Sequence, residues 1–170
     1  MQWEAVLGDI TTQQVDAVVN AANSQLMGGG GVDGAIHAAA GPALLQECRQ
    51  VRASRWHDGL PVGEAVATGA GELPARWVIH TVGPNRHRGQ TDPALLASAF
   101  RRSIEVAGEV GARSVAFPAI SAGIYGWDAE VVAETAVRTL LDTPSGPVEQ
   151  IRFVLFSARL HEVFTAALPR

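Results

Sequence analysis

The stretch that decides the organisation of this chain runs from Asn20 to His37 and reads NAANSQLMGGGGVDGAIH. The apolar run 15–19 before it predicts a buried strand, and the run 35–40 at its end predicts a helix. Four consecutive glycines, 28–31, lie between them. A glycine loop that enters a helix N-terminus presents backbone N–H donors and the positive end of the helix dipole. The stretch therefore favours a site for a phosphate group.

Three polar side chains flank the glycines: Asn20 and Asn23 before them, and Asp33 after them. Amide side chains can hydrogen-bond the hydroxyls of a sugar, and a carboxylate can orient or deprotonate one. The alternative interpretation is a flexible turn in which Asp33 caps the N-terminus of the following helix. The stretch alone leaves both interpretations open.

Length and composition predict one compact domain spanning residues 1–170, because the chain is long enough to bury a sizeable core. Apolar residues make up 47% and charged residues 18% of it. There is no lysine and no basic run, and the net charge is −4, which disfavours a protein that grips nucleic acid through its phosphates. The single cysteine, Cys48, excludes an internal disulfide, and its apolar neighbours predict a packing role.

Strand and helix patterns alternate along the chain. We expect strands at 3–7, 15–21, 64–69, 77–82, 114–120 and 150–156, and helices at 35–40, from Pro42, from Asp92 to Gly111, at 128–141 and after Ser157. The link 70–76 is too short for a parallel crossover, so the strands on either side of it should pair antiparallel. The remaining order predicts a three-layer α/β/α fold with a mixed, mostly parallel central sheet.

A second glycine loop, Ser121–Gly126, follows the predicted strand 114–120. Ligands of such sheets bind beyond the carboxyl ends of the strands, where both glycine loops should meet. Without lysine neither loop is a Walker motif, and neither joins Gly-x-Gly-x-x-Gly to an acidic residue at the next strand end. These absences disfavour nucleotide hydrolysis and hydride transfer. No His/Cys cluster has metal-ligand spacing, so we expect no metal site.

With these motifs in this order, the sequence resembles the macrodomain family, and within it the MacroD-type ADP-ribosyl hydrolases, which also deacetylate O-acetyl-ADP-ribose. The segments that carry the resemblance are Gly8–Thr11, Val15–Asn23, Gly28–His37, Val78–Pro84 and Phe117–Gly126. They cover nearly the whole chain.

The resemblance implies a role for each matching residue. Asp9 and Ile10 would meet the adenine ring, and Phe156 would stack on it. Backbone amides of Gly30, Gly31 and Val32 would surround the phosphates and ribose, and the loop of Ser121, Ala122, Gly123, Ile124, Tyr125 and Gly126 would wrap the diphosphate. Asn20, Asn23 and Asp33 would face the distal ribose, with Asp33 and Asn20 as the catalytic pair. Trp127 and Asp128 stand where the family commonly has Tyr or Phe and then Pro; we expect Trp127 to be an exposed wall beside that ribose.

Four residues have alternative interpretations. His37 and His80 could be general bases, but their apolar surroundings favour satisfied core histidines. Phe156 could belong to the core instead of stacking on adenine. Asp9 could be only a turn residue before Thr11.

Two functions from different classes follow. The first is an enzyme that hydrolyses the ester between mono-ADP-ribose and acidic protein side chains, and also O-acetyl-ADP-ribose. The second is a reader module that binds ADP-ribose without cleaving it; Asp33 favours the enzyme, because a reader needs no carboxylate there. The implied partners are ADP-ribose, its derivatives and mono-ADP-ribosylated proteins, with nucleic acid only as an ADP-ribosylated substrate. We expect no cofactor, no membrane contact, a monomer and a cytoplasmic location.

Overall fold

A single mixed sheet of six strands forms the centre of the computed structural model, which describes all 170 residues. The strands are β1 (Gln2–Leu7), β2 (Ala17–Ala21), β3 (Ala65–Gly69), β4 (Trp77–Thr81), β5 (Ser114–Phe117) and β6 (Gln150–Leu155). Their order across the sheet is β1-β6-β5-β2-β4-β3. All neighbours pair parallel except β3 and β4, which pair antiparallel at one edge. The predicted antiparallel edge is confirmed.

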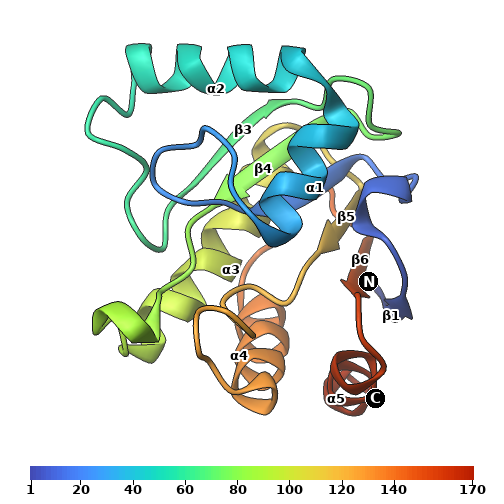
Figure 1. The fold of residues 1–170 in the computed structure, drawn as a ribbon. Helices are drawn as coiled ribbons and strands as arrows, with labels where there is room; N and C mark the ends of the chain where they lie inside the picture. Colours follow the sequence, from blue (N-terminus) through green and yellow to red (C-terminus); the bar gives the residue numbers. More distant parts are fainter.

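Helices cover both faces of the sheet and complete the predicted α/β/α layers (Figure 1). They are α1 (Gly31–Ala40), α2 (Pro42–Ser54), α3 (Pro93–Glu109), α4 (Ala129–Asp142) and α5 (Ala158–Ala167), with short 3-10 turns η1 (Ile10–Thr12) and η2 (Arg86–Arg88). α1 and α2 pack on one face around Ile36, Leu44 and Cys48. α3, α4 and α5 pack on the other around Phe100, Phe117, Phe153 and Phe164. No helix is both long enough and apolar enough to span a bilayer.

Side-chain caps start the helices on the second face. Asp92, Asp128 and Ser157 accept hydrogen bonds from backbone N–H groups in the first turns of α3, α4 and α5. These bonds satisfy donors that a helix N-terminus leaves without partners. Both α4 and α5 therefore begin directly after the loops that leave β5 and β6.

Two boundaries differ from the sequence prediction in ways that shape the site. β5 ends at Phe117 instead of continuing to residue 120, because Pro118 has no N–H for the ladder. α1 begins at Gly31 and not at the predicted Ala35, so its first turn includes the last glycine of the loop. Gly30 is the N-cap and no side chain caps this helix. The interpretation of Asp33 as the N-cap is therefore wrong.

Candidate functional site

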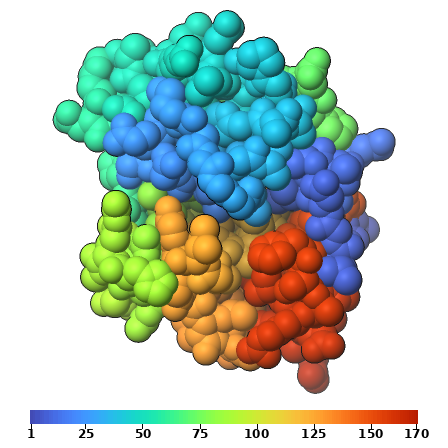
Figure 2. Space-filling view, viewed as in Figure 1, coloured from blue at the N-terminus to red at the C-terminus, as the bar shows by residue number.

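The two glycine loops leave neighbouring parallel strands at the same edge of the sheet, because β2 pairs with β5. In the space-filling view, the blue residues of the first loop border the orange residues near 125 (Figure 2). Gly30 and Gly31 are exposed on this side, and Val32 is half-buried. In the second loop Gly123, Ile124 and Gly126 are exposed, and Ala122 and Tyr125 are half-buried. Both loops therefore present backbone at one surface, as predicted.

Asn20 and Asp33 meet at the base of this surface. Asn20 lies in β2 and is fully buried, while Asp33 lies in the first turn of α1 and is 5% exposed. Nδ2 of Asn20 donates a hydrogen bond to Oδ1 of Asp33 at 2.8 Å. Their other oxygens, Oδ1 of Asn20 and Oδ2 of Asp33, have no hydrogen-bond partner. Two buried acceptors without partners are costly, which is typical of a site prepared for a ligand.

Burial raises the pKa of Asp33 above its ordinary value, against the lowering effects of the Asn20 hydrogen bond and His37. Glycine at two positions makes room for this carboxylate. A Cβ on Gly29 would stand 3.1 Å from Oδ2 of Asp33 and 3.3 Å from Nδ2 of Asn23. A Cβ on Gly34 would collide with the carbonyl oxygen of Gly29. The loop can therefore close over Asp33 only with glycine at position 34, and a side chain at position 29 would crowd the carboxylate.

A fully buried histidine fixes the orientation of the Asn20 amide. Nε2 of His80 lies 3.0 Å from Oγ1 of Thr68, whose proton is donated to the carbonyl oxygen of Gly69. Nε2 must then carry the ring proton, which leaves Nδ1 to accept from Nδ2 of Asn20 at 3.2 Å. Burial lowers the pKa of His80 to about 3, so the ring is neutral. His80 is a core histidine, as predicted, and fixes which side of the Asn20 amide carries its oxygen.

His37 is not the satisfied core histidine that the sequence suggested. Its Nε2 lies 3.5 Å from Oδ1 of Asp33 and makes no hydrogen bond. The two residues are four apart on α1, so they share one face of the helix. That spacing was the signal in the sequence from which the contact could have been found.

Ser121 begins the second loop in a left-handed conformation, with a φ of 68°, and is buried. Non-glycine residues rarely adopt this conformation, and it often occurs at functional sites. Its Oγ has no hydrogen-bond partner and faces Gly83, where a Cβ would collide with it. Ser121 is therefore a further buried polar group left free beside the loop backbone.

Trp127 is not the exposed wall that the sequence predicted. Its side chain belongs to the core beneath α4, with only 5% exposed, and its indole N–H donates to the carbonyl oxygen of Pro84 at 3.0 Å. The backbone N–H of Trp127 donates a hydrogen bond to the carbonyl oxygen of Ser121, and this bond closes the short loop with the indole on its inner side. Its neighbour Tyr125 is half-buried and lines the surface instead.

The residues predicted to hold adenine lie together at the β1–β6 end of the same edge. The N–H of Gly8 donates to the carbonyl oxygen of Leu155, so Asp9 and Phe156 leave adjacent strands side by side. Phe156 is 73% exposed, which excludes the core interpretation. Hydrogen bonds from Thr11 lower the pKa of Asp9, which keeps it ionised. The side chain of Ile10 is buried in the core, so only its backbone can meet a ligand.

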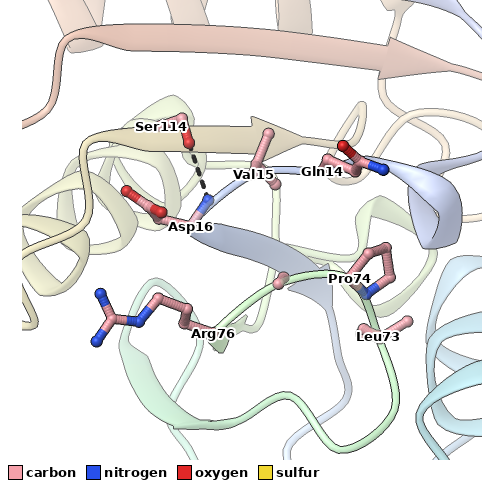
Figure 3. Close-up of a pocket in the computed structure, with 8 residues that line it drawn as sticks. Gln14, Val15, Asp16, Leu73, Pro74, Arg76 and Ser114 are labelled. Carbon is pink, nitrogen blue, oxygen red and sulfur yellow. Dashed lines mark hydrogen bonds between the residues drawn. The ribbon is translucent and has the colours of Figure 1, made fainter.

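Another cavity, of about 420 Å³, lies at the opposite edge of the sheet and is lined by Asp16, Arg76 and Ser114 among others (Figure 3). Asp16 makes structural hydrogen bonds there: its backbone N–H donates to Oγ of Ser114, and Oδ2 accepts from the backbone N–H of Arg113. That cavity lies where strands of the sheet begin, and none of its lining residues belongs to the glycine loops.

No group of three or more His, Cys, Asp or Glu side chains is placed to hold a metal ion.

Comparison with known proteins agrees with this arrangement. The family model for the Macro domain matches residues 19–136, which include both glycine loops. The chain belongs to the macrodomain family. Among its relatives, the O-acetyl-ADP-ribose deacetylase of Klebsiella pneumoniae is 50% identical over 171 residues, covering 99% of this chain and 97% of the relative.

Solved macrodomain structures match the whole fold. The Oceanobacillus iheyensis macrodomain with ADP is 39% identical, with a TM-score of 0.89, over 96% of this chain and 87% of that one. The Trypanosoma brucei macrodomain in complex with ADP-ribose is 35% identical, with a TM-score of 0.84, over 95% of this chain and 67% of that one. The macrodomain fold predicted from the sequence is therefore confirmed.

Proposed function

We propose that this macrodomain binds ADP-ribose and hydrolyses esters on its distal ribose, with O-acetyl-ADP-ribose and mono-ADP-ribosylated Asp or Glu side chains as substrates. The observation that carries the proposal is the buried pair Asn20–Asp33, which keeps two oxygen acceptors free between two glycine loops. The relative from Klebsiella pneumoniae is named for the first of these reactions, and the Trypanosoma brucei structure holds ADP-ribose. Both support the assignment.

Each part of the site has a place in this proposal. Asp9 and Phe156 hold adenine by a hydrogen bond and by stacking. The backbone of Gly30, Gly31 and Val32 and of the loop from Ser121 to Gly126 surrounds the diphosphate. These contacts fix the distal ribose against Asn20 and Asp33, so that the ester is held in one orientation.

The chemistry assigned to Asp33 is to orient or deprotonate a ribose hydroxyl or a water molecule. Hydrolysis adds water across the ester C–O bond and yields ADP-ribose and a carboxylate, with release of one proton. Oδ2 of Asp33 has no protein partner and can accept that proton, while Oδ1 of Asn20 accepts a hydrogen bond from the ribose. His37, at 3.5 Å from Asp33, stabilises the ionised carboxylate when protonated.

The test is incubation of the protein with O-acetyl-ADP-ribose and, separately, with a protein that carries mono-ADP-ribose on glutamate. We expect release of ADP-ribose from both. Calorimetry should show micromolar affinity for ADP-ribose and much weaker affinity for AMP. Binding without release would instead make this macrodomain a reader module, and equal affinity for AMP and ADP-ribose would contradict the assigned diphosphate and distal-ribose contacts.

A further inference from the structure

We propose that the cavity beside Asn23 and Tyr125 is a peptide subsite, which receives an acidic segment of the modified protein around the ADP-ribosylated side chain. The cavity has a volume of about 420 Å³ and is also lined by Gln25, Asn85, Arg88 and Gln90. The inference rests on the proposed function. In that function the acyl group of the ester beside Asp33 belongs to a polypeptide, and the subsite would hold this polypeptide.

Asn23 places the cavity close to the Asn20–Asp33 pair. The position of a Cβ on Gly29 lies 3.3 Å from Nδ2 of Asn23 and 3.1 Å from Oδ2 of Asp33, so both groups border the same glycine. Asn23 also lines the cavity. A group attached to a ribose at Asp33 can therefore extend into it. A cavity of this size is far larger than an acetyl group requires.

The amide side chains that line the cavity have their oxygens already occupied by the protein. Oδ1 of Asn85 accepts from the N–H of His87 at 3.0 Å, and Oε1 of Gln90 accepts from the N–H of Asn85 at 2.8 Å. Oε1 of Gln25 accepts from Nη1 of Arg52 at 2.7 Å. Each donor is a backbone N–H or a guanidinium, which cannot accept, so these three amides cannot be turned around.

The groups that these amides leave over are all hydrogen-bond donors, beside the hydroxyls of Ser24 and Tyr125, which can donate or accept. Gln25, Asn85 and Gln90 keep their NH₂ groups free of protein partners, and Oδ1 of Asn23 is likewise occupied, by the N–H of Gln25 at 3.1 Å. No Asp or Glu lines the cavity. Such a wall favours a ligand rich in acceptors, such as carboxylates and peptide carbonyls.

Arg88 supplies a positive charge without an acidic partner. It lies in η2, is exposed, and is absent from every ion pair of the chain. η2 is held against the second glycine loop, since the N–H of Arg86 donates to the carbonyl oxygen of Tyr125 at 2.9 Å and the Arg86 guanidinium stacks on Trp127. In Figure 2 the yellow-green residues of this segment lie next to the orange loop. The protein as a whole carries a net charge of −4, which repels acidic partners, but the local positive charge of Arg88 attracts an acidic segment to this cavity.

The test compares two substrates: O-acetyl-ADP-ribose, and a peptide with one ADP-ribosylated glutamate flanked by aspartates. Arg88→Glu should lower kcat/KM for the peptide about tenfold and leave that for O-acetyl-ADP-ribose unchanged. Arg138→Glu, an exposed arginine on α4, is the matched control and should change neither. A peptide flanked by alanines should lose the dependence on Arg88. Equal losses on both substrates, or no loss on either, would overturn the subsite.

A binding measurement separates this inference from the proposed function. An ADP-ribosylated peptide with a non-hydrolysable linkage and acidic flanks should bind about tenfold more tightly than ADP-ribose, and Arg88→Glu should remove the difference. If that holds while neither ester is cleaved, the subsite stands and hydrolysis fails. If both esters are cleaved while the peptide analogue and ADP-ribose bind equally, hydrolysis stands and the subsite is wrong.

Discussion

Nδ2 of Asn20 donates to Oδ1 of Asp33 across 2.8 Å, and this bond joins the end of a central strand to the first turn of a helix. It forms because the glycine loop between them is short enough to bring α1 back over β2. The bond occupies one oxygen of the carboxylate and one side of the amide. The oxygens that remain, Oδ1 of Asn20 and Oδ2 of Asp33, are buried acceptors without a hydrogen-bond partner in the protein.

Replacement of Asp33 by asparagine tests the proposed chemistry. The variant keeps the side-chain shape and an acceptor for Asn20, but it cannot take a proton. We expect turnover of O-acetyl-ADP-ribose to fall roughly a hundredfold to ten-thousandfold, with little change in affinity for ADP-ribose, since most binding contacts lie elsewhere. Single-turnover assays measure the turnover, and calorimetry on the same variant measures the affinity. Full turnover with normal binding would remove Asp33 from the mechanism.

The raised pKa of Asp33 predicts how activity and stability depend on pH. Because burial favours the protonated form, hydrolysis that needs the ionised carboxylate should decline on the acid side around a pKa above the ordinary aspartate value of 3.8. The folded protein then holds this proton more tightly than the unfolded chain does. Its contribution to the free energy of unfolding is therefore lost as pH rises from the unfolded value through the folded one.

Asp33→Asn isolates that contribution. The variant should be more stable than the wild type at neutral pH, and the gain should vanish below the ordinary aspartate pKa. Denaturant titrations of both proteins across this range measure it. A variant less stable at neutral pH would mean that the carboxylate is stabilised in place and that its burial carries no cost.

The sequence predicted the sheet and both loops well because each depends on local patterns: apolar runs, glycine clusters and capping residues such as Asp92 and Ser157. It failed where a long-range contact decided the outcome. Trp127 follows a glycine loop, but its indole packs in the core beneath α4 and donates to the distant Pro84 carbonyl, neither of which the local sequence shows. His37 was predicted to be a core residue because its sequence neighbours are apolar, and the sequence alone does not place its ring beside Asp33. α1 starts at Gly31 instead of the expected Ala35, and this earlier start rules out the alternative interpretation of Asp33 as a helix cap.

Asp9→Ala should weaken ADP-ribose binding because it removes a charge-assisted hydrogen bond to adenine worth about 1.5–3 kcal/mol. It also removes the cap of η1, where Oδ1 accepts from the N–H of Thr11. Asp92→Ala is the matched control, since Asp92 makes the same kind of cap on α3, far from adenine. Both variants should lose about 1 kcal/mol of stability, and only Asp9→Ala should raise the dissociation constant. An equal effect of both on binding would reject the adenine contact.

Phe156→Ala should also weaken ADP-ribose binding, because it removes the ring proposed to stack on adenine. An exposed aromatic ring that stacks on a base contributes about 1–3 kcal/mol, and Phe156 is 73% exposed in the free protein. Its removal should therefore leave the melting temperature nearly unchanged. Leu141→Ala, at a residue 57% exposed on α4, is the control for loss of exposed apolar surface. If calorimetry gave the same affinity for Phe156→Ala as for the control, adenine would not stack there.

His80 acts on the proposed chemistry through Asn20. Its Nδ1 accepts from Nδ2 of Asn20, and this bond fixes the orientation of the amide whose Oδ1 is the acceptor proposed for the ribose. His80→Asn keeps an acceptor near the position of Nδ1, whereas His80→Gln places its amide near Nε2 and Thr68. Asparagine is one methylene shorter than glutamine and leaves more empty volume in the core, so the asparagine variant should be the less stable of the two. We expect the glutamine variant to lose roughly tenfold to a hundredfold in kcat through misplacement of the amide, and the asparagine variant to retain more.

A double-mutant cycle separates this positioning role from a general loss of packing. In an Asn20→Ala background no amide remains to be oriented, so His80→Asn and His80→Gln should have the same kcat. A packing defect would instead lower kcat by the same factor whether or not Asn20 is present. Additive losses across the cycle would therefore show that His80 supports only the core. Non-additive losses would show that its neutral ring, held as the Nε2 tautomer by Thr68, sets the direction of the Asn20 amide.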